Sequence, residues 1–357
     1  MARTHERSSS PAPSSPGESE SKRLKTSHDT PDADESTMIH FAERTLNAGN
    51  IQNLNKSYTT SEPFKHAIVD ALFQNDLLIK VKDECLKELS FTEKETDIYK
   101  VRDLVHNFDL ICRKKNKSIH QVRQTGDLAS LSYLSSDLLS RLPSLLTLRD
   151  ALYSPTFRAF IRSVTGCGPL SGTKQDMSVN NYTKGCHLLN HDDVIGTRRV
   201  SYILYMPLPA TSEWKEEWGG ALELYDTKLG KDGIPEPVPT PCKKIPPSWN
   251  QFVFFEVQPG KSFHSVEEVV VGGEGDEDRR ARLSISGWFH APQEGEEGYE
   301  LANTVKEVKS SREQLVSLYG VCYYELTQTL DLYPFYVIQI VSEFRRSSYC
   351  GYTSYDD

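Results

Sequence analysis

The chain lacks paired cysteines and long apolar runs. Its seven cysteines are scattered through 357 residues, and no two of them form a CxxC pair. Neither a zinc knuckle nor a disulfide framework is expected, because this pattern is typical of reduced thiols in a cytosolic or nuclear protein. No stretch approaches the ~18 consecutive apolar residues of a membrane-spanning helix. The first residues lead into serine and proline instead of an apolar segment, which predicts no secretory signal and no membrane partner.

Basic residues are also fewer than acidic ones. The chain has 41 lysines and arginines against 50 aspartates and glutamates, a net charge of -9. Proteins that bind nucleic acid through its phosphates concentrate basic side chains, so no direct nucleic-acid partner is expected. A basic protein, such as a ribosomal or chromatin protein, suits this charge better.

Residues 1–36 are rich in serine, proline and charge and contain almost no large apolar side chains. Such a segment cannot bury enough surface to offset its ordering entropy, and it is predicted to be disordered. Within it lies the basic cluster Lys22-Arg23-Leu24-Lys25. This cluster is either a nuclear import signal or a solvated run of charge, and its sequence favours neither.

Residues 37–165 show apolar side chains at intervals of three and four, which is typical of helices. Phe64, Ile68 and Leu72 follow this spacing, and a longer example runs from residue 128 to residue 146. Ser154 before Pro155 marks a helix start, because serine caps and proline fits the first turn. We expect these helices to brace a sheet and not to carry the chemistry.

After Gly166 the pattern changes to short β-rich segments between loops rich in proline and glycine. The expected strands are residues 200–205, 221–225, 252–255 and 283–289. Because no helical pattern lies between them, they favour an antiparallel sandwich, barrel or jelly roll. An acidic, glycine-rich stretch at 272–278 is expected to be an exposed loop, and residues 301–318 a helix. Residues 319–357 show no clear period.

A His-x-Asp pair is the first candidate for chemistry. In an extended segment, residues two apart point to the same side, so His191 and Asp193 would both face into a barrel while Asp192 faces away. An imidazole and a carboxylate on one face are two of the three ligands of the facial triad that binds iron(II). The pair by itself is weak, since His-x-Asp often arises by chance.

A third ligand must come from a strand remote in sequence. His264 follows the apolar run that begins at Phe252 and the turn Pro259-Gly260, so it would begin the next strand near a barrel mouth. His290, at the far end of the last strand, is the weaker alternative. His187 lies too close to His191 to come from a neighbouring strand, and we interpret it as a surface histidine or one paired by a local hydrogen bond.

Arg282 opens the strand 283–289. An arginine before an apolar strand is usually a solvated edge residue, but its planar guanidinium can also grip a carboxylate through two parallel hydrogen bonds. Ser284 shares the inward face and could add a hydroxyl donor. Tyr182 and Tyr205 lie on either side of the His-x-Asp pair, and each is equally consistent with donation to that carboxylate and with core packing.

An ordered series of motifs joins these candidates. It consists of His191-x-Asp193, Arg199-Val200-Ser201-Tyr202-Ile203-Leu204-Tyr205, Trp218-Gly219-Gly220-Ala221-Leu222, Trp249-Asn250, Phe254-Phe255, Phe263-His264 and Arg282-Leu283-Ser284-Ile285-Ser286-Gly287-Trp288-Phe289-His290. The series resembles the prolyl hydroxylases that modify a small-subunit ribosomal protein, a branch of the 2-oxoglutarate- and iron(II)-dependent dioxygenases. The order of the motifs makes this resemblance more specific than any single motif.

The resemblance implies an α+β fold for residues 37–292, with a double-stranded β-helix (jelly-roll) core braced by N-terminal helices. It implies iron on His191, Asp193 and His264, and 2-oxoglutarate on Arg282 with Tyr182 and Tyr205. Members of the family carry a second β-helix domain. Residues 293–357 do not resemble it and are expected to be an atypical segment, a remnant of a truncated second domain.

The same resemblance implies an activity. The expected reaction is hydroxylation at carbon 3 of a proline in a small-subunit ribosomal protein, with an effect on translation termination. The expected cofactors are Fe(2+), 2-oxoglutarate, O2 and L-ascorbate. A regulator of a transcription factor is a second expected partner, and the expected location is the nucleus and cytoplasm.

Two other classes of function compete with this one. The first is a non-catalytic oxygen-sensing or interaction protein that keeps the dioxygenase fold; succinate formation would separate it from the enzyme. The second is a zinc-dependent hydrolase built on the same three ligands. Zinc favours tetrahedral sites with an activated water, and the sequence offers no obvious general base to serve it.

Overall fold

The computed structural model describes residues 37–94, 122–124 and 135–299, apart from residue 211, residues 231–232 and residues 273–278. The predicted N-terminal disorder, its basic cluster, the predicted helix 301–318 and nearly all of the acidic loop lie outside the described residues. So does the C-terminal segment beyond residue 299. None of the described helices is long and apolar enough to cross a bilayer.

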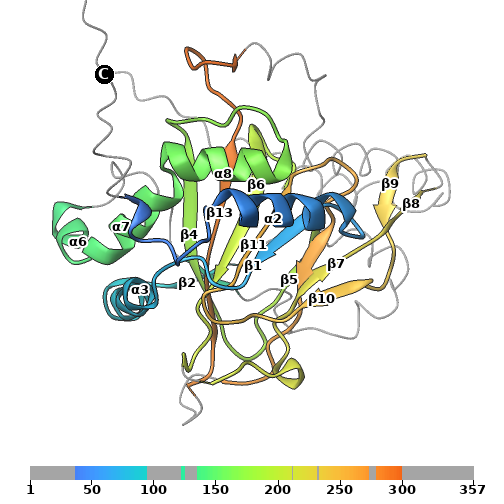
Figure 1. Ribbon diagram of the computed structural model, residues 1–357. Helices are drawn as coiled ribbons and strands as arrows, with labels where there is room; N and C mark the ends of the chain where they lie inside the picture. The colour runs from blue at the N-terminus through green and yellow to red at the C-terminus, as the bar shows by residue number, and fades with distance from the viewer. Residues whose placement is uncertain are drawn as a thin grey trace, which may run out of the picture.

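Two antiparallel sheets face each other and form the body of the molecule (Figure 1). The seven-stranded sheet has the order β1 (His66–Val69), β11 (Phe252–Glu256), β6 (Arg198–Tyr205), β13 (Arg282–His290), β4 (Gln175–Tyr182), β3 (Val122–Gln124) and β2 (Thr92–Lys94). The four-stranded sheet has the order β10 (Lys243–Ile245), β7 (Leu222–Leu224), β12 (His264–Val266) and β5 (Leu188–His191). A separate hairpin joins β8 (Thr227–Leu229) to β9 (Pro235–Pro237).

From β4 onward the chain passes back and forth between the two sheets. Strands β4, β6, β11 and β13 lie in the larger sheet, and β5, β7, β10 and β12 lie in the smaller one. This interleaving is the connectivity of a jelly roll. The predicted α+β fold with a double-stranded β-helix core is confirmed, and so are the four expected strands.

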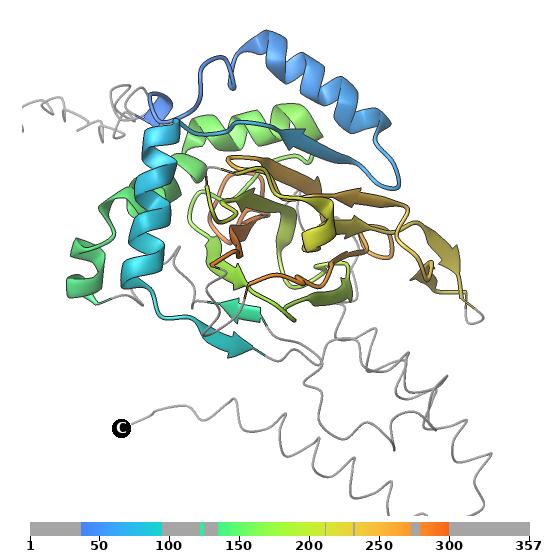
Figure 2. The ribbon, with the colours of Figure 1, turned by 90° about the horizontal axis from the view of Figure 1, so that it is seen from below.

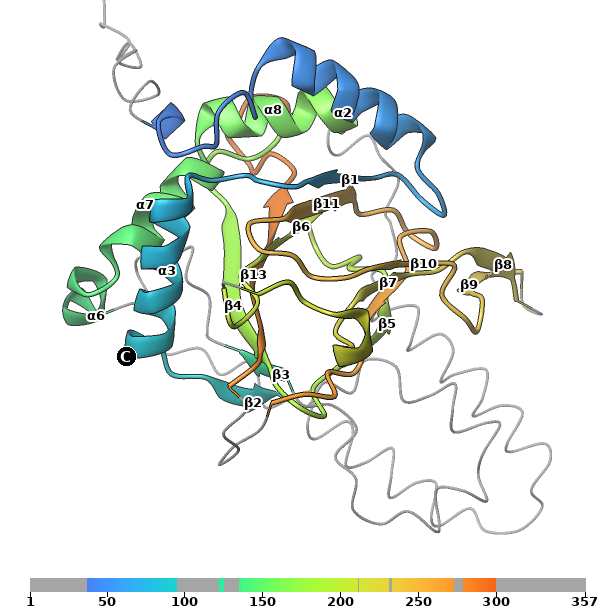
Figure 3. The same cartoon turned by 60° about the horizontal axis from the view of Figure 1, so that its bottom comes forward.

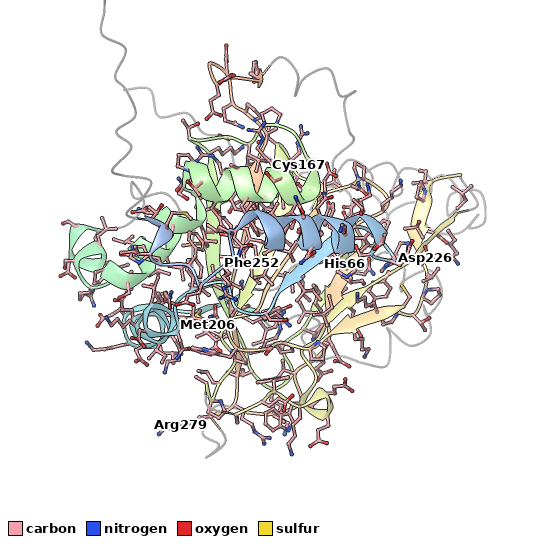
Figure 4. All side chains as sticks on the ribbon, viewed as in Figure 1. His66, Cys167, Met206, Asp226, Phe252 and Arg279 are labelled. Carbon is pink, nitrogen blue, oxygen red and sulfur yellow. The ribbon has the colours of Figure 1, made fainter. Side chains whose placement is uncertain are left out.

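Helices cover the outer face of the larger sheet. Helices α2 (Ala48–Thr60) and α8 (Pro155–Thr165) lie side by side across it, and α3 (Asn75–Glu88), α6 (Ser136–Ser140) and α7 (Pro143–Leu152) lie at its side (Figures 1 and 3). Phe252, labelled in Figure 4, packs against Phe157 of α8 with the ring centroids 5.7 Å apart. Burial of such aromatic pairs stabilises the contact between helices and sheet. The predicted bracing role of the helices is thus confirmed.

Helix α8 begins where the sequence predicts. The side chain of Ser154 accepts a hydrogen bond from the backbone N–H of Phe157, and Pro155 occupies the first turn. Gly166 ends the helix in the left-handed conformation with φ of 74°. A serine cap at one end and a left-handed glycine at the other are strong boundary signals, because both satisfy backbone groups that the helix leaves free.

The prediction that residues 37–165 are mostly helical is wrong for one of its own examples. Ile68, one of the residues whose spacing favoured a helix, lies on β1, and β2 and β3 also fall in this region. The four-residue interval between Phe64, Ile68 and Leu72 does not indicate a helix here. The segment around Ile68 is the edge strand β1, which pairs with β11. A four-residue interval is also two strand repeats, so a short apolar run does not distinguish the two.

Strand β13 separates the core beneath the helices from the interior of the barrel. Leu283, Ile285 and Phe289 belong to the core that contains α8. The alternate residues of β13 face the other way, into the barrel, because side chains alternate along a strand. Arg282 lies opposite Tyr182 of β4, and Ser284 lies opposite Tyr205 of β6. Figure 2 shows the barrel with the helices packed on its outside.

Candidate active site

Two histidines from neighbouring strands face each other inside the barrel. His191 ends β5, His264 begins β12, and the two are register partners with ring centroids 4.1 Å apart. Nδ1 of His191 lies 2.7 Å from the carbonyl oxygen of Leu189, and Nδ1 of His264 lies 2.8 Å from that of Ser262. A carbonyl oxygen can only accept, so each neutral ring carries its proton on Nδ1 and keeps the Nε2 lone pair free.

The carboxylate of Asp193 completes the group. Its Oδ1 lies 3.3 Å from Nε2 of His191, and its Oδ2 lies 3.4 Å from Nε2 of His264. Two donors hold Oδ2: the hydroxyl of Ser201 at 2.7 Å and the indole Nε1 of Trp288 at 3.0 Å. Apart from His191, the nearest basic side chain to Oδ1 among the described residues is Arg198, whose Nη1 lies 3.7 Å away, too far for a hydrogen bond, so Oδ1 is the oxygen with more freedom to bind a ligand.

The charges of the three side chains depend on one another. Burial would raise the pKa of Asp193, but the charges of His191 and His264 and their hydrogen bonds outweigh it and hold this pKa well below its usual range. Burial would lower the pKa of His191, but the Asp193 carboxylate outweighs it and raises this pKa. The carboxylate is thus ionised and demands positive charge beside it. A bound dication would supply that charge in place of a proton.

The donor set fits a divalent transition metal. Within the described residues, His191, Asp193 and His264 are the group of metal-ligating side chains that come together, with ligand atoms all within 4.8 Å of one another. Two imidazoles and one carboxylate make up the facial triad of non-haem iron(II) oxygenases, which leaves coordination positions open. Histidines that ligate a metal generally donate their other N–H to an oxygen, as both do here.

The expected extended conformation of the His-x-Asp pair is wrong, although its two side chains do converge. Asp193 has a φ of 59°, in the left-handed region, and it follows the last residue of β5. The turn, and not strand alternation, brings its carboxylate beside His191. Asp192 does not face solvent; it is fully buried, and its carboxylate accepts long hydrogen bonds from the N–H groups of Val194 and Gly260, both 3.4 Å.

Arg282 lies inside the barrel and is not a solvated edge residue, being only 1% exposed. Its Nε donates to the carbonyl of Gly220 at 2.7 Å. Its Nη1 lies 3.3 Å from the hydroxyl of Ser284, and its Nη2 lies 3.4 Å from that of Tyr205. Among the described residues no carboxylate pairs with it. A buried, unpaired cation is costly, so this guanidinium favours an anionic ligand.

Two tyrosines enclose the guanidinium. The Cζ atom of Arg282 lies 4.7 Å from the ring centroid of Tyr182 and 4.9 Å from that of Tyr205. Burial raises the pKa of Tyr182 to about 12 and also raises that of Tyr205, in both cases against the opposing charge of Arg282. Both phenols are therefore neutral and able to donate at neutral pH. The structure brings both of the predicted tyrosines to the predicted arginine.

The two alternative histidines lie outside the group of three. Nδ1 of His290 lies 3.0 Å from the hydroxyl of Thr197, and its Nε2 lies 3.8 Å from Asp176. Nδ1 of His187 lies 3.0 Å from the carbonyl of Gly185. His264, the preferred third candidate, is the one that joins His191 and Asp193. Its strand β12 begins at this residue, as predicted.

Sequence reasoning missed several residues that hold the site together. Trp288 and Ser201, which donate to Asp193, both lie on inward-facing positions of their strands. Alternation along β13 from Arg282 and Ser284 would have identified Trp288. Gly220, which accepts from Arg282, left no such signal, because its role depends on a contact between segments 62 residues apart.

Comparison with known proteins indicates what the chain is similar to. Residues 177–290 match the family model of the 2OG-Fe(II) oxygenase superfamily. This segment is therefore similar to members of that superfamily. The matched segment runs from β4 to the end of β13 and so includes both the three metal-ligating side chains and Arg282. Members of the superfamily use iron(II), 2-oxoglutarate and dioxygen, which agrees with the donor set of the site.

The relatives within the superfamily include prolyl hydroxylases. Prolyl 3,4-dihydroxylase OGFOD1 of Ostreococcus tauri is 41% identical over 247 residues, which are 68% of this chain and 41% of that protein. Prolyl 3-hydroxylase OGFOD1 of Mus musculus is 33% identical over 231 residues, 65% of this chain and 33% of that protein. The matched part is thus less than half of the length of these curated relatives. The resemblance of the motifs to prolyl hydroxylases is confirmed.

A solved structure of a Trichoplax adhaerens prolyl hydroxylase, in complex with a peptide of the hypoxia inducible factor, also aligns with the chain. The alignment covers 73% of this chain and 98% of that chain, with 13% identity and a TM-score of 0.44. The fold assignment rests on the strand order and not on this similarity.

Proposed function

We propose that the chain is a 2-oxoglutarate- and iron(II)-dependent dioxygenase that hydroxylates a prolyl residue of a protein. One observation supports this above all others. A facial triad of His191, Asp193 and His264 and a buried arginine without a carboxylate partner among the described residues face the interior of the same barrel. A dicarboxylic oxo acid can chelate a metal on the triad with one end and bind the arginine with its other carboxylate.

His191, Asp193 and His264 would hold iron(II). Each histidine would present Nε2, since Nδ1 is hydrogen-bonded to a backbone carbonyl, and Asp193 would present Oδ1, since Ser201 and Trp288 hold Oδ2. Bound iron and 2-oxoglutarate would together supply the activation of dioxygen, and the oxo acid would be converted to succinate and carbon dioxide. The protein supplies geometry, because hydrogen bonds behind each ligand fix its direction before the metal arrives.

Arg282 would bind the distal carboxylate of 2-oxoglutarate. Its Nε is engaged by Gly220, so the edge formed by Nη1 and Nη2 remains for the carboxylate oxygens. Ser284 and Tyr205 lie at this edge and could donate to the same oxygens. The aromatic rings of Tyr182 and Tyr205 exclude water from the pair, which strengthens the charge-assisted hydrogen bonds.

The finer proposal concerns the substrate and its setting. We propose carbon 3 of a proline in a small-subunit ribosomal protein as the target, with an effect on translation termination. The names of the relatives support a prolyl target, and the net charge of -9 suits a basic ribosomal protein. A transcription-factor regulator as a second partner, L-ascorbate as a reductant, and a nuclear and cytoplasmic location complete the proposal. The predicted boundaries of residues 1–36, 37–292 and 293–357 remain part of it.

Mass spectrometry tests the proposal directly. Purified protein with iron(II), 2-oxoglutarate and a small-subunit ribosomal protein should add one oxygen to a single proline, with about one succinate released for each oxygen added. The His191→Ala variant should lose both products, since it removes one of three metal ligands. The His187→Ala variant is the matched control and should retain them, because His187 lies outside the triad. Hydroxylation by His191→Ala at the wild-type rate would refute the assignment.

A further inference from the structure

The Gly219–Gly220 turn lies directly against the buried arginine. It lies just before β7, opposite the segment that follows β12. Hydrogen bonds on either side, from Glu267 N–H to the Ala221 carbonyl and from Val270 N–H to the Trp218 carbonyl, pair the two segments. Between these bonds the carbonyl of Gly219 accepts from Nε1 of Trp214 at 2.8 Å, and that of Gly220 accepts from Arg282.

The two glycines are needed for different reasons. Both have positive φ, 69° and 75°. A Cβ on Gly219 would lie 2.0 Å from the backbone carbonyl oxygen of Glu268, which no rearrangement of side chains can relieve. A Cβ on Gly220 would instead lie 3.0 Å from Cδ of Arg282 and 3.0 Å from Cγ2 of Val269. Gly219 thus serves the turn, whereas Gly220 leaves room for the arginine.

The position of Gly220 decides where the guanidinium lies. Its carbonyl fixes Nε, and the missing side chain allows the Cδ of Arg282 to rest directly against the backbone. The opposite edge of the guanidinium points to Ser284 and Tyr205. A methyl group at position 220 would push the arginine by a few tenths of an ångström and weaken the bond to Nε. Two-point recognition of a carboxylate is sensitive to such shifts, because both hydrogen bonds must stay aligned.

We propose that Gly220 is a specificity-determining residue of the oxo-acid site: it positions Arg282 so that 2-oxo acids with a second, distal carboxylate are selected over those without one. This inference rests on the proposed function of Arg282. It places part of the selectivity for the co-substrate in a residue that does not touch the co-substrate. Gly220 is therefore a positioning residue, acting through the arginine.

The test compares two ligands of equal length on the full chain. 2-Oxoglutarate and 2-oxopentanoate both carry five carbons and the metal-chelating 2-oxo acid group, but 2-oxopentanoate ends in a methyl group. Their dissociation constants would be measured by calorimetric titration of manganese(II)-loaded protein without oxygen. Gly220→Ala should weaken 2-oxoglutarate binding about tenfold, the loss of one charge-assisted hydrogen bond. It should change 2-oxopentanoate binding less than about twofold, since no distal carboxylate is lost.

Gly166→Ala is the matched control. Gly166 has a φ of 74°, nearly that of Gly220, but a Cβ there would meet no atom within 4 Å. Both variants place an alanine at nearly the same positive φ, and they differ in the contact with Arg282. Gly166→Ala should leave the ratio of the two dissociation constants at the wild-type value. Thermal unfolding of each loaded protein reports whether the fold and the metal site are intact.

The outcomes separate the two proposals. A preference for 2-oxoglutarate in the wild type that shrinks in Gly220→Ala supports the role of Gly220. An equal loss of both ligands in Gly220→Ala, or no loss of either, overturns it while leaving the function of Arg282 in place. If the wild type itself shows no preference for 2-oxoglutarate over 2-oxopentanoate, the proposed function of Arg282 fails first.

Discussion

The two ends of the barrel interior carry opposite charges, which the protein compensates to different extents. At the metal end, the Asp193 carboxylate lies beside two imidazoles and accepts from Ser201 and Trp288, so its charge is partly met by the protein. At the arginine end, the guanidinium of Arg282 is 1% exposed and no described carboxylate meets it. The end with Asp193 is suited to bind a cation, and the end with Arg282 is suited to bind an anion.

The difference shows that the side chains at both ends are oriented before any ligand binds, but only those at the metal end are partly neutralised. Metal ligands are oriented by hydrogen bonds to their far atoms, and that order is present before the metal binds. The arginine is oriented by Gly220, Ser284 and two aromatic rings, which fix its position without neutralising it. Under the proposed function, the binding energy at that end would come from the ligand's own charge, since folding has already removed the arginine from water.

Replacing the arginine with lysine should give the largest effect. Arg282→Lys keeps the positive charge but loses the two-point fork, so 2-oxoglutarate binding should weaken roughly 30- to 100-fold while metal binding stays unchanged. Calorimetric titration of the loaded protein measures the first quantity, and elemental analysis measures the second. Arg279→Lys, at an exposed position three residues earlier and labelled at the lower end of the molecule in Figure 4, is the control. Unchanged 2-oxoglutarate binding in Arg282→Lys would show that the positive charge alone, and not the fork, binds the acid. An equal loss in Arg279→Lys would show that the effect is not specific to the guanidinium of Arg282.

Replacing Trp288, which donates to Asp193, should have a smaller effect, and this effect should be confined to metal binding. Trp288→Phe removes the indole donor to Oδ2 of Asp193 and keeps a ring for Arg198, whose Cζ lies 3.4 Å from the Trp288 ring centroid. Metal affinity should fall about tenfold, as for other hydrogen bonds behind metal ligands. The preference for 2-oxoglutarate over 2-oxopentanoate should stay as in the wild type.

The control for this variant is Trp249→Phe. Trp249 donates its indole N–H to Asn75 at 2.7 Å, away from the triad, so the same atoms are removed without touching Asp193. Competition with a chromogenic chelator would measure metal affinity in both variants. If Trp288→Phe and Trp249→Phe bound metal equally well, the indole would have no part in holding the carboxylate.

The smallest effect is expected at the rim, where Glu296 ties the segment after β13 to the residues before β4. Its carboxylate accepts hydrogen bonds from the N–H groups of Gly172 and Thr173. Burial would raise the pKa of Glu296, but these and other hydrogen bonds outweigh it and lower the pKa to about 2. A depressed carboxyl pKa contributes stability above the ordinary value near 4.5, and that stability is lost as pH falls toward 2.

Glu296→Gln should therefore lower the free energy of unfolding by about 1 kcal/mol near neutral pH, a figure reduced for solvent screening of a half-exposed group. The difference from wild type should shrink as pH falls from 4.5 toward 2, because the unfolded carboxyl takes up a proton in this range while the native carboxylate stays ionised. Denaturant unfolding at several pH values measures this, with Glu297→Gln as the adjacent exposed control. Metal and 2-oxoglutarate affinity should not change; a loss of either would show that the rim supports the site.

The features that could be predicted from the sequence are those with a local pattern, namely strand alternation and helix boundaries. Strand alternation placed Arg282 and Ser284 on one face, and the serine and proline at 154 and 155 marked the start of α8. Together with the order of the motifs, these signals predicted the barrel and brought His264 to the His-x-Asp pair. The predictions of strand faces and helix boundaries succeed because they depend on neighbours along the chain, whereas the meeting of His264 with the His-x-Asp pair was implied by the resemblance that the motifs carry.

The features that sequence reasoning missed depend on contacts made after folding. Asp193 reaches His191 through a left-handed turn, although the pair was expected to be extended. Ile68 lies on a strand because β11 offers an edge to pair with, although its spacing also fitted a helix. Gly220 matters because Arg282 lies against it. In each case a partner distant in the chain overrides the local preference.

The left-handed backbone at Asp193 restricts what could ever replace this ligand. Aspartate and asparagine tolerate a φ near 59°, whereas a side chain with another methylene before its carboxylate does so less readily. A glutamate would also overshoot the two imidazoles by about one C–C bond, ~1.5 Å. An engineer who wants to delete the carboxylate and preserve the turn should choose glycine over alanine, because glycine alone accepts this backbone at no steric cost.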